Sequence, residues 1–124
     1  MPSLEAASQQ AHRKTVESSF RDVASYLQEV LGQKLVAYLA AAADPRTVAR
    51  WISGEREPRA VAEQRVRFAY QIFQFLLAEE APQTVRAWFI GLNPQLDDES
   101  PAACIRAGQF REVMGAAKAF LAGG

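Results

Sequence analysis

The sequence predicts an all-α fold, and three observations point to it. Apolar residues recur at intervals of three and four along most of the chain, which is the spacing of one helix face. A capping residue is followed directly by proline in Asp44-Pro45 and Ser100-Pro101, as at helix starts. No segment shows the alternation of a strand. With 124 residues, of which 49% are hydrophobic, the chain has the size and composition of one globular domain, with or without a small appendage.

The first helices are predicted after a polar start. Residues 1–15 are rich in Ala, Ser and Gln and show no persistent apolar stripe, so we expect residues 1–17 to form a flexible leader. From about Ser18 to Gly32 the spacing becomes helical. A second helix is predicted over 33–43.

The stretch 44–54 reads as a short helix with its own start and stop. Asp44 can cap the first free amides, Pro45 suits the first helical position, and Gly54 can adopt the left-handed conformation that ends a helix. At 100° per residue, one face gathers Val48, Ala49 and Ile52. The opposite face gathers Arg46, Arg50 and Ser53, with Thr47 at its margin.

Four more helices complete the predicted fold. After a charged connector, a long helix over about 59–80 carries two adjacent apolar faces. Its width indicates either a central helix or a helix that also meets another chain. Pro82 opens the next helix, which ends at Gly91, and an extended acidic segment follows it. Two final helices, from Ser100-Pro101 and after Gly108, close the chain.

The distribution of charge favours a nucleic-acid contact at the 44–54 helix. The net charge of the chain is zero, but residues 34–67 carry seven basic and four acidic side chains. A helix that buries aliphatic residues and presents two arginines one turn apart is typical of the reading helix of a helix-turn-helix. The other interpretation is that these arginines form an ordinary solvent-exposed helix face that binds no nucleic acid. The predicted DNA-binding residues are Arg46, Thr47, Arg50, Ser53, Lys34 and Arg56, and Arg59 is a further phosphate-contact candidate.

Several other classes of protein are disfavoured. The single cysteine, Cys104, cannot form an internal disulfide, and no apolar run is long enough to cross a bilayer, so we expect a cytoplasmic protein without a membrane partner. We also expect no enzymatic activity, cofactor or metal, because His12 is the only histidine and no Gly-rich phosphate loop is present. The adjacent acids 97–99 lack the spacing of a calcium loop.

Two motifs together resemble a known family. The stretch Ala43-Asp44-Pro45-Arg46-Thr47-Val48-Ala49-Arg50-Trp51-Ile52-Ser53-Gly54 resembles the helix-turn-helix of Xre-type antitoxins. The stretch Ala87-Trp88-Phe89-Ile90-Gly91-Leu92-Asn93-Pro94-Gln95-Leu96, followed by Ser100-Pro101 and Gly108, resembles the toxin-binding domain of the Xre/MbcA/ParS family. The similarity covers about residues 20–124. One difference is the run Ala40–Ala43, which lacks the glycine common in the turn of this motif.

The resemblance implies a function and a division of the chain. It implies the antitoxin of a type II module, which blocks a NAD-consuming RES-domain toxin and represses its own operon by binding operator DNA. Residues 18–80 would be the Xre-like helix-turn-helix domain, joined by the long helix to a small helical toxin-binding domain over 81–124. The toxin-contacting positions would be Trp88, Asn93, Pro94, Ser100, Pro101 and Gly108.

The last predictions concern the oligomeric state of the protein and its alternative functions. We expect a homodimer, because one reading helix contacts too few bases for operator specificity. The first alternative is a free-standing helix-turn-helix transcription regulator without a toxin partner. The second is an enzyme, for which the sequence offers little support.

Overall fold

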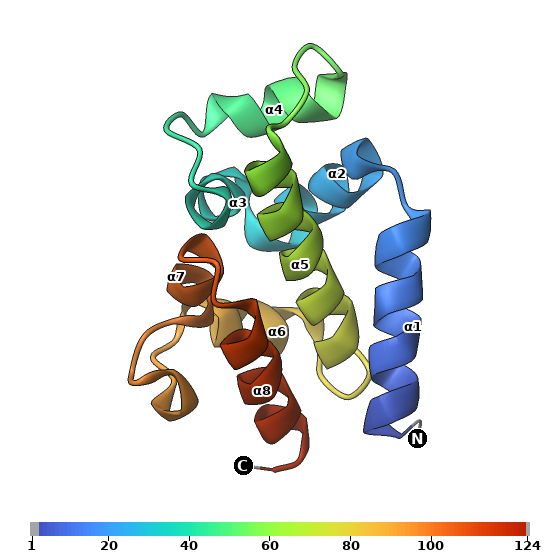
Figure 1. Ribbon diagram of the computed structural model, residues 1–124, viewed down its shortest axis with the longest axis vertical. Helices are drawn as coiled ribbons and strands as arrows, with labels where there is room; N and C mark the ends of the chain where they lie inside the picture. The colour runs from blue at the N-terminus through green and yellow to red at the C-terminus, as the bar shows by residue number, and fades with distance from the viewer. Residues whose placement is uncertain (1–2, 124) are drawn as a thin grey trace.

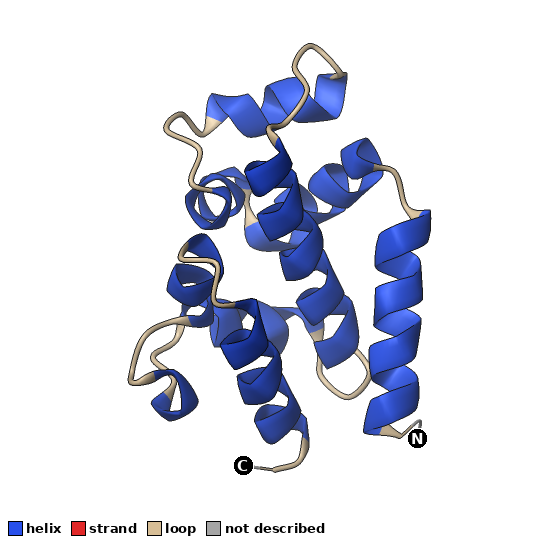
Figure 2. Cartoon of the chain, viewed as in Figure 1, coloured by secondary structure: helices blue, strands red, loops and turns tan. Residues whose placement is uncertain are grey.

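The computed structural model describes residues 3–123 and confirms the all-α fold (Figures 1 and 2). No β-strand occurs in this part of the chain, where an isolated bridge pairs Asn93 with Glu99. The helices, with one short 3₁₀ turn η1, are α1 (Leu4–Glu17), α2 (Phe20–Leu31), α3 (Gln33–Ala40), α4 (Arg46–Ser53), α5 (Ala60–Leu76), α6 (Pro82–Ile90), η1 (Pro94–Leu96), α7 (Pro101–Arg106) and α8 (Phe110–Leu121).

The long helix α5 is the centre of the fold, as one of the two interpretations of its apolar width predicted. It runs through the middle of the molecule and packs against α1, α2, α3, α7 and α8 (Figure 1). Its buried residues are Val66, Ala69, Tyr70, Ile72, Phe73, Phe75 and Leu76. The adjacent face is used within the chain as well, since the Phe68 ring stacks on Phe110 with centroids 4.5 Å apart. The apolar width of α5 is therefore explained without a second chain.

The prediction of a flexible leader over 1–17 is wrong for residues 4–17, which form α1 along one side of α5 (Figure 1). Residues 1 and 2 lie outside the described part. The face of α1 toward the core carries small residues one turn apart, namely Ala7, Ala11 and Thr15. Small side chains let two helices approach closely but add little hydrophobicity, so this stripe did not stand out in the sequence.

Hydrogen bonds from α5 hold the end of α1 in place. The Arg67 guanidinium donates to the backbone carbonyls of Thr15 and Ser18, both at 2.9 Å, and its Nε donates to Glu63 at 2.7 Å. These contacts satisfy carbonyls at the C-terminus of α1, where helices leave acceptors free.

The turn between α3 and α4 is closed by an alanine in an unfavourable conformation. Helix α3 ends at Ala40 rather than at the predicted residue 43, because Ala41 is left-handed, with φ 60° and ψ 33°. The amide of Ala42 donates to the carbonyl of Ala37 at 2.9 Å, and the Ala41 amide donates to Tyr38 at 3.0 Å. This pattern is a Schellman ending, in which glycine normally occupies the left-handed position. The absent turn glycine is thus replaced by a strained alanine.

One buried cluster runs through both halves of the chain. It includes residues from α1 through α8, on both sides of the predicted domain boundary at 80/81. A surface contact also joins the halves: the Arg106 guanidinium donates to the Tyr38 carbonyl at 2.6 Å and lies 4.8 Å from the centre of the Tyr38 ring. The division into two domains stays a prediction.

Candidate functional site

Helix α4 ends before Gly54 as predicted, and it begins at Arg46, one residue after the predicted first position at Pro45. Asp44 Oδ1 accepts a hydrogen bond from the Arg46 amide at 2.9 Å, and Gly54 is left-handed with φ 81°. At the far end, Arg21 of α2 donates to the carbonyl of Ile52 at 2.9 Å, placing a cation where the helix dipole is negative. Both ends of this short helix are therefore stabilised by side chains.

The buried face of α4 differs from the prediction in one position. Val48 is fully buried as predicted, but Ala49 is exposed. Trp51, which was not predicted to face the core, is buried in its stead. The Trp51 ring meets Phe20 of α2 edge to face, with centroids 5.6 Å apart. Because α2 packs against α4, the large indole gains more from burial on that side than an alanine would.

Arg46 projects into solvent and is paired with its own helix cap. Its side chain is 77% exposed, and its Nη2 lies 2.9 Å from Asp44 Oδ2. The Arg46 Nε also donates to both Asp44 oxygens, at 3.1 and 3.2 Å. These hydrogen bonds, more than any other cause, hold the pKa of the Asp44 carboxyl below its ordinary value. An exposed pair of this kind opens easily when a phosphate competes for the arginine.

Arg50 and Ser53 lie one turn further along α4. Arg50 is 41% exposed, and its Nε lies 3.6 Å from Glu55 Oε2. The Ser53 hydroxyl donates to the Arg50 carbonyl at 3.1 Å and accepts from the Glu55 amide at 3.3 Å. Ser53 therefore helps to end the helix, and its hydroxyl is already occupied by backbone groups.

A hollow of about 520 Å³ lies between the α3–α4 turn and the connector that follows α4. It is lined by three predicted DNA-binding residues, Thr47, Arg50 and Arg56, and also by Arg59. Asp44 and Glu57 line it too, so its charge is mixed, with one more cation than anions. Lys34 is not part of this hollow and instead lines a separate one at the start of α3.

The C-terminal motif residues mostly fix the course of the backbone. Asn93 Oδ1 accepts from the Gln95 amide at 2.9 Å, which caps the 3₁₀ turn that Pro94 begins. The Asn93 amide donates to the Glu99 carbonyl at 3.1 Å and closes the same loop. This segment is therefore a tight, internally bonded loop rather than the extended stretch that the sequence predicted.

The second part of the motif shapes α7. Ser100 Oγ accepts from the Ala103 amide at 3.0 Å, and the buried Pro101 occupies the first helical position. Gly108 is left-handed, with φ 80°, and its amide donates to the Ile105 carbonyl at 2.9 Å. An added Cβ at Gly108 would meet no atom within 4 Å, so the conformation rather than space favours glycine there.

Trp88 is the motif residue whose side chain packs into the core. It is 9% exposed, and its ring meets Phe89 edge to face at 5.5 Å and Phe120 of α8 at 6.3 Å. Its buried Nε1 has no hydrogen-bond acceptor among the described residues. A buried unpaired indole N–H is unfavourable, so this group either is tolerated for packing or finds an acceptor in a complex.

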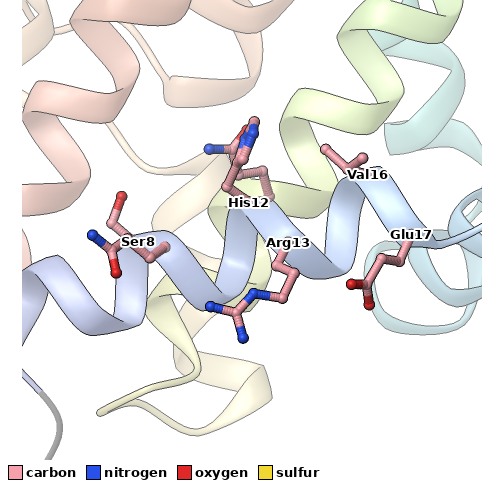
Figure 3. Close-up of a pocket in the computed structure, with 7 residues that line it drawn as sticks. Ser8, His12, Arg13, Val16 and Glu17 are labelled. Atoms are coloured by element: carbon pink, nitrogen blue, oxygen red, sulfur yellow. The ribbon is translucent and has the colours of Figure 1, made fainter.

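Among residues 3–123, no three His, Cys, Asp or Glu side chains gather as metal ligands would. His12 lines a hollow of about 560 Å³ along α1. There the side chains of Ser8, His12, Arg13, Val16 and Glu17 diverge from the helix instead of converging on one point (Figure 3). No described helix is both long and apolar enough to cross a membrane.

Cys104 is a buried side chain of α7. Burial is the first cause that raises the pKa of its thiol, and Glu99, Glu112 and Asp97 add to the effect. The thiol is therefore kept protonated and hidden, which suits packing and opposes nucleophilic chemistry.

Comparison with known proteins gives one similarity. No established family profile matches the chain, and no solved structure matches it significantly. Curated proteins from Mycobacterium bovis and from two strains of Mycobacterium tuberculosis, each named mycobacterial cidal antitoxin MbcA, are 34% identical to it over 74 residues. The match covers 58% of this chain and 64% of each relative, so the chain spans less than two thirds of their length. Over that stretch the chain is similar to a bacterial antitoxin.

Proposed function

We propose that this protein is the antitoxin of a two-gene toxin–antitoxin module. The observation that carries the proposal is the 34% identity to a curated antitoxin over 74 residues. The proposed partner is a RES-domain toxin that consumes NAD, which the antitoxin inhibits by binding and not by catalysis. Trp88 and the loops at Asn93, Ser100 and Gly108 would form or support the surface that contacts the toxin.

We further propose that α4 binds operator DNA and that the complex represses its own operon in the cytoplasm. The support is the exposed Arg46 and the partly exposed Arg50, together with the cations Arg56 and Arg59, which line the same hollow as Arg50. Neutralising phosphates with such side chains gives salt-dependent affinity. A homodimer would place two copies of α4 on the two halves of a symmetric operator.

Co-expression with the product of the adjacent gene tests the antitoxin role. The expected result is that the toxin alone stops growth, that this protein restores growth, and that the two purify together. If growth is not restored and no complex forms, the protein is not the antitoxin of that gene. A free-standing transcription regulator would then be the better explanation, provided that operator DNA is still bound.

The dimer is tested separately by sedimentation of the purified protein at micromolar concentration. A single species with twice the chain mass is expected. A monomer in the absence of toxin and DNA contradicts the homodimer. If the dimer forms, its interface lies on elements other than α5, because α5 is covered within the chain.

A further inference from the structure

A groove between α3 and α6 combines exposed apolar side chains with positive charge. It has a volume of about 790 Å³. Its lining residues come from the α2–α3 junction, from α3 and from α6: Leu31, Gly32, Gln33, Lys34, Leu35, Tyr38, Arg86 and Ile90. The α6 residues are far from the others in the sequence, so the groove exists only in the folded chain.

Two exposed large apolar side chains meet at this groove. The described residues include five exposed large hydrophobic side chains, and two of them, Tyr38 at 43% and Ile90 at 49%, line this groove. A third, Leu92 at 78%, follows Ile90 by two residues beyond the end of α6 and is not a lining residue of the groove. Single exposed apolar residues need no explanation, but a cluster on one surface marks an interaction site.

The charges around the groove have one sign. Its lining includes the exposed cations Lys34 and Arg86, and no Asp or Glu is among the lining residues of the described chain. A third cation, Arg106, lies against the Tyr38 ring, where its hydrogen bond to the Tyr38 carbonyl holds it. A groove lined by apolar side chains and cations is complementary to a segment that combines apolar residues with acidic ones.

These observations also decide against a second copy of the chain in this groove. In a symmetric dimer formed through this face, Lys34, Arg86 and Arg106 would approach the same cations of the other copy. Like charges brought together in this way oppose association. A symmetric dimer through this face is therefore disfavoured, and a different polypeptide with acidic side chains is the better complement.

We infer that the groove between α3 and α6 binds a segment that combines apolar and acidic side chains, supplied by the toxin partner. This inference rests on the proposed antitoxin function and adds a surface to it. None of the predicted toxin-contacting residues lines the groove, although Ile90 lies two residues from Trp88. The surface also gives Lys34 a role in protein binding in place of its predicted role on DNA.

The test compares variants in their binding to the toxin of the adjacent gene, produced in an inactive form. Lys34→Glu with Arg86→Glu reverses the charge of two lining residues, and Ile90→Ser removes an apolar side chain from the groove. Both change exposed side chains, so the unfolding midpoint in urea is expected to stay that of wild type. Each variant is expected to raise the dissociation constant for the toxin at least about tenfold. Added salt is expected to weaken toxin binding by wild type more than binding by the charge-reversed variant. The matched control is Arg111→Glu with Lys118→Glu, which makes the same charge change on exposed positions of α8.

The outcomes separate this inference from the proposed function. If wild type binds the toxin and the groove variants bind equally well, the groove is not the contact surface, while the antitoxin role stands. If the groove variants lose operator DNA and keep the toxin, the surface serves nucleic acid and the inference is wrong. If wild type itself forms no complex, the proposed function fails, and the inference fails with it.

Discussion

Helix α4 and the C-terminal loops both hold residues that the sequence singled out, but they use those residues differently. On α4, Arg46 extends into solvent and Arg50 is partly exposed, and each is paired with an acid just outside the helix, Asp44 or Glu55. In the C-terminal loops, Asn93 and Ser100 direct their side chains to backbone amides, while Gly108 supplies a backbone conformation. One region leaves charged side chains accessible to solvent, and the other uses its side chains to fix the course of the backbone.

This difference changes how variants in the two regions are interpreted. A side chain that contributes only to binding can be removed with little effect on stability, whereas a capping or buried residue affects folding and binding together. A motif shared with a family can therefore mark a common backbone rather than a common contact. The following experiments measure how complete this separation is.

The largest change in the free energy of unfolding is expected from replacing Trp88, which is buried against Phe89 and Phe120. Trp88→Ala should lower the free energy of unfolding by about 3–5 kcal/mol, because the ring leaves a cavity. Trp88→Phe keeps most of the ring and removes the unpaired Nε1, so a loss below about 1.5 kcal/mol is expected. Urea denaturation at constant m-value measures both changes.

The same pair of variants separates packing from contact at this position. If Trp88→Phe is stable but binds the toxin much less well, the indole N–H is used in the complex, and Trp88 belongs with the binding residues. A loss of less than about 1 kcal/mol in Trp88→Ala would contradict its assignment to the core.

The second effect concerns DNA affinity. Replacing Arg46 and Arg50 by alanine should weaken operator binding at least about tenfold, since each such arginine is worth about 1–3 kcal/mol. Stability should stay within about 0.5 kcal/mol of wild type, and toxin binding should not change. Fluorescence anisotropy with labelled operator DNA measures the affinity at fixed salt.

Arg111→Ala with Lys118→Ala is the matched control, since it removes two exposed cations from α8. An equal loss of affinity in this control would mean that net charge, and not α4, governs binding. Loss of toxin inhibition in the α4 variant would show that the two regions are not separable.

A smaller effect is expected in the turn that positions α4. Ala41→Gly should raise the free energy of unfolding by up to about 1 kcal/mol, because glycine adopts the left-handed conformation without strain. Ala42→Gly is the control: Ala42 has no positive φ, so glycine there should only destabilise. Thermal or urea unfolding compares the two, and equal destabilisation by both would contradict strain at Ala41.

The smallest effect is the titration of Asp44. NMR should place the pKa of its carboxyl below the ordinary 3.8, and Arg46→Ala should return it toward that value. Since the pKa is lowered in the folded state, the pair contributes to stability above the unfolded pKa, and this contribution is lost as the pH falls through the folded pKa. An unchanged pKa in Arg46→Ala would mean that another group, such as the helix N-terminus, lowers it.

The local features of the fold were largely predictable because they depend on near neighbours in the sequence. Capping by Asp44 and Ser100, the proline starts and the left-handed Gly54 all act within one turn of a helix. Helix α1 was missed because its core-facing residues are small, and their value depends on how closely α5 approaches.

The candidate sites were predictable only in part. The exposed arginines of α4 follow from its periodicity, since a helix with one apolar face presents its other face to solvent. The packing of Trp88 and the hydrogen-bonded loop from Asn93 to Glu99 could not be read from spacing, because the partner atoms lie in other elements or across a turn.

By itself, the sequence determined the all-α class, most helix boundaries and the basic outer face of α4, because each depends on interactions within about one helical turn. The tertiary structure alone decided the covering of α5, the inward position of Trp51, and the groove where Tyr38, Arg86 and Ile90 meet. Which apolar side chains stay exposed depends on how distant helices pack, and the groove between α3 and α6 arises from that packing.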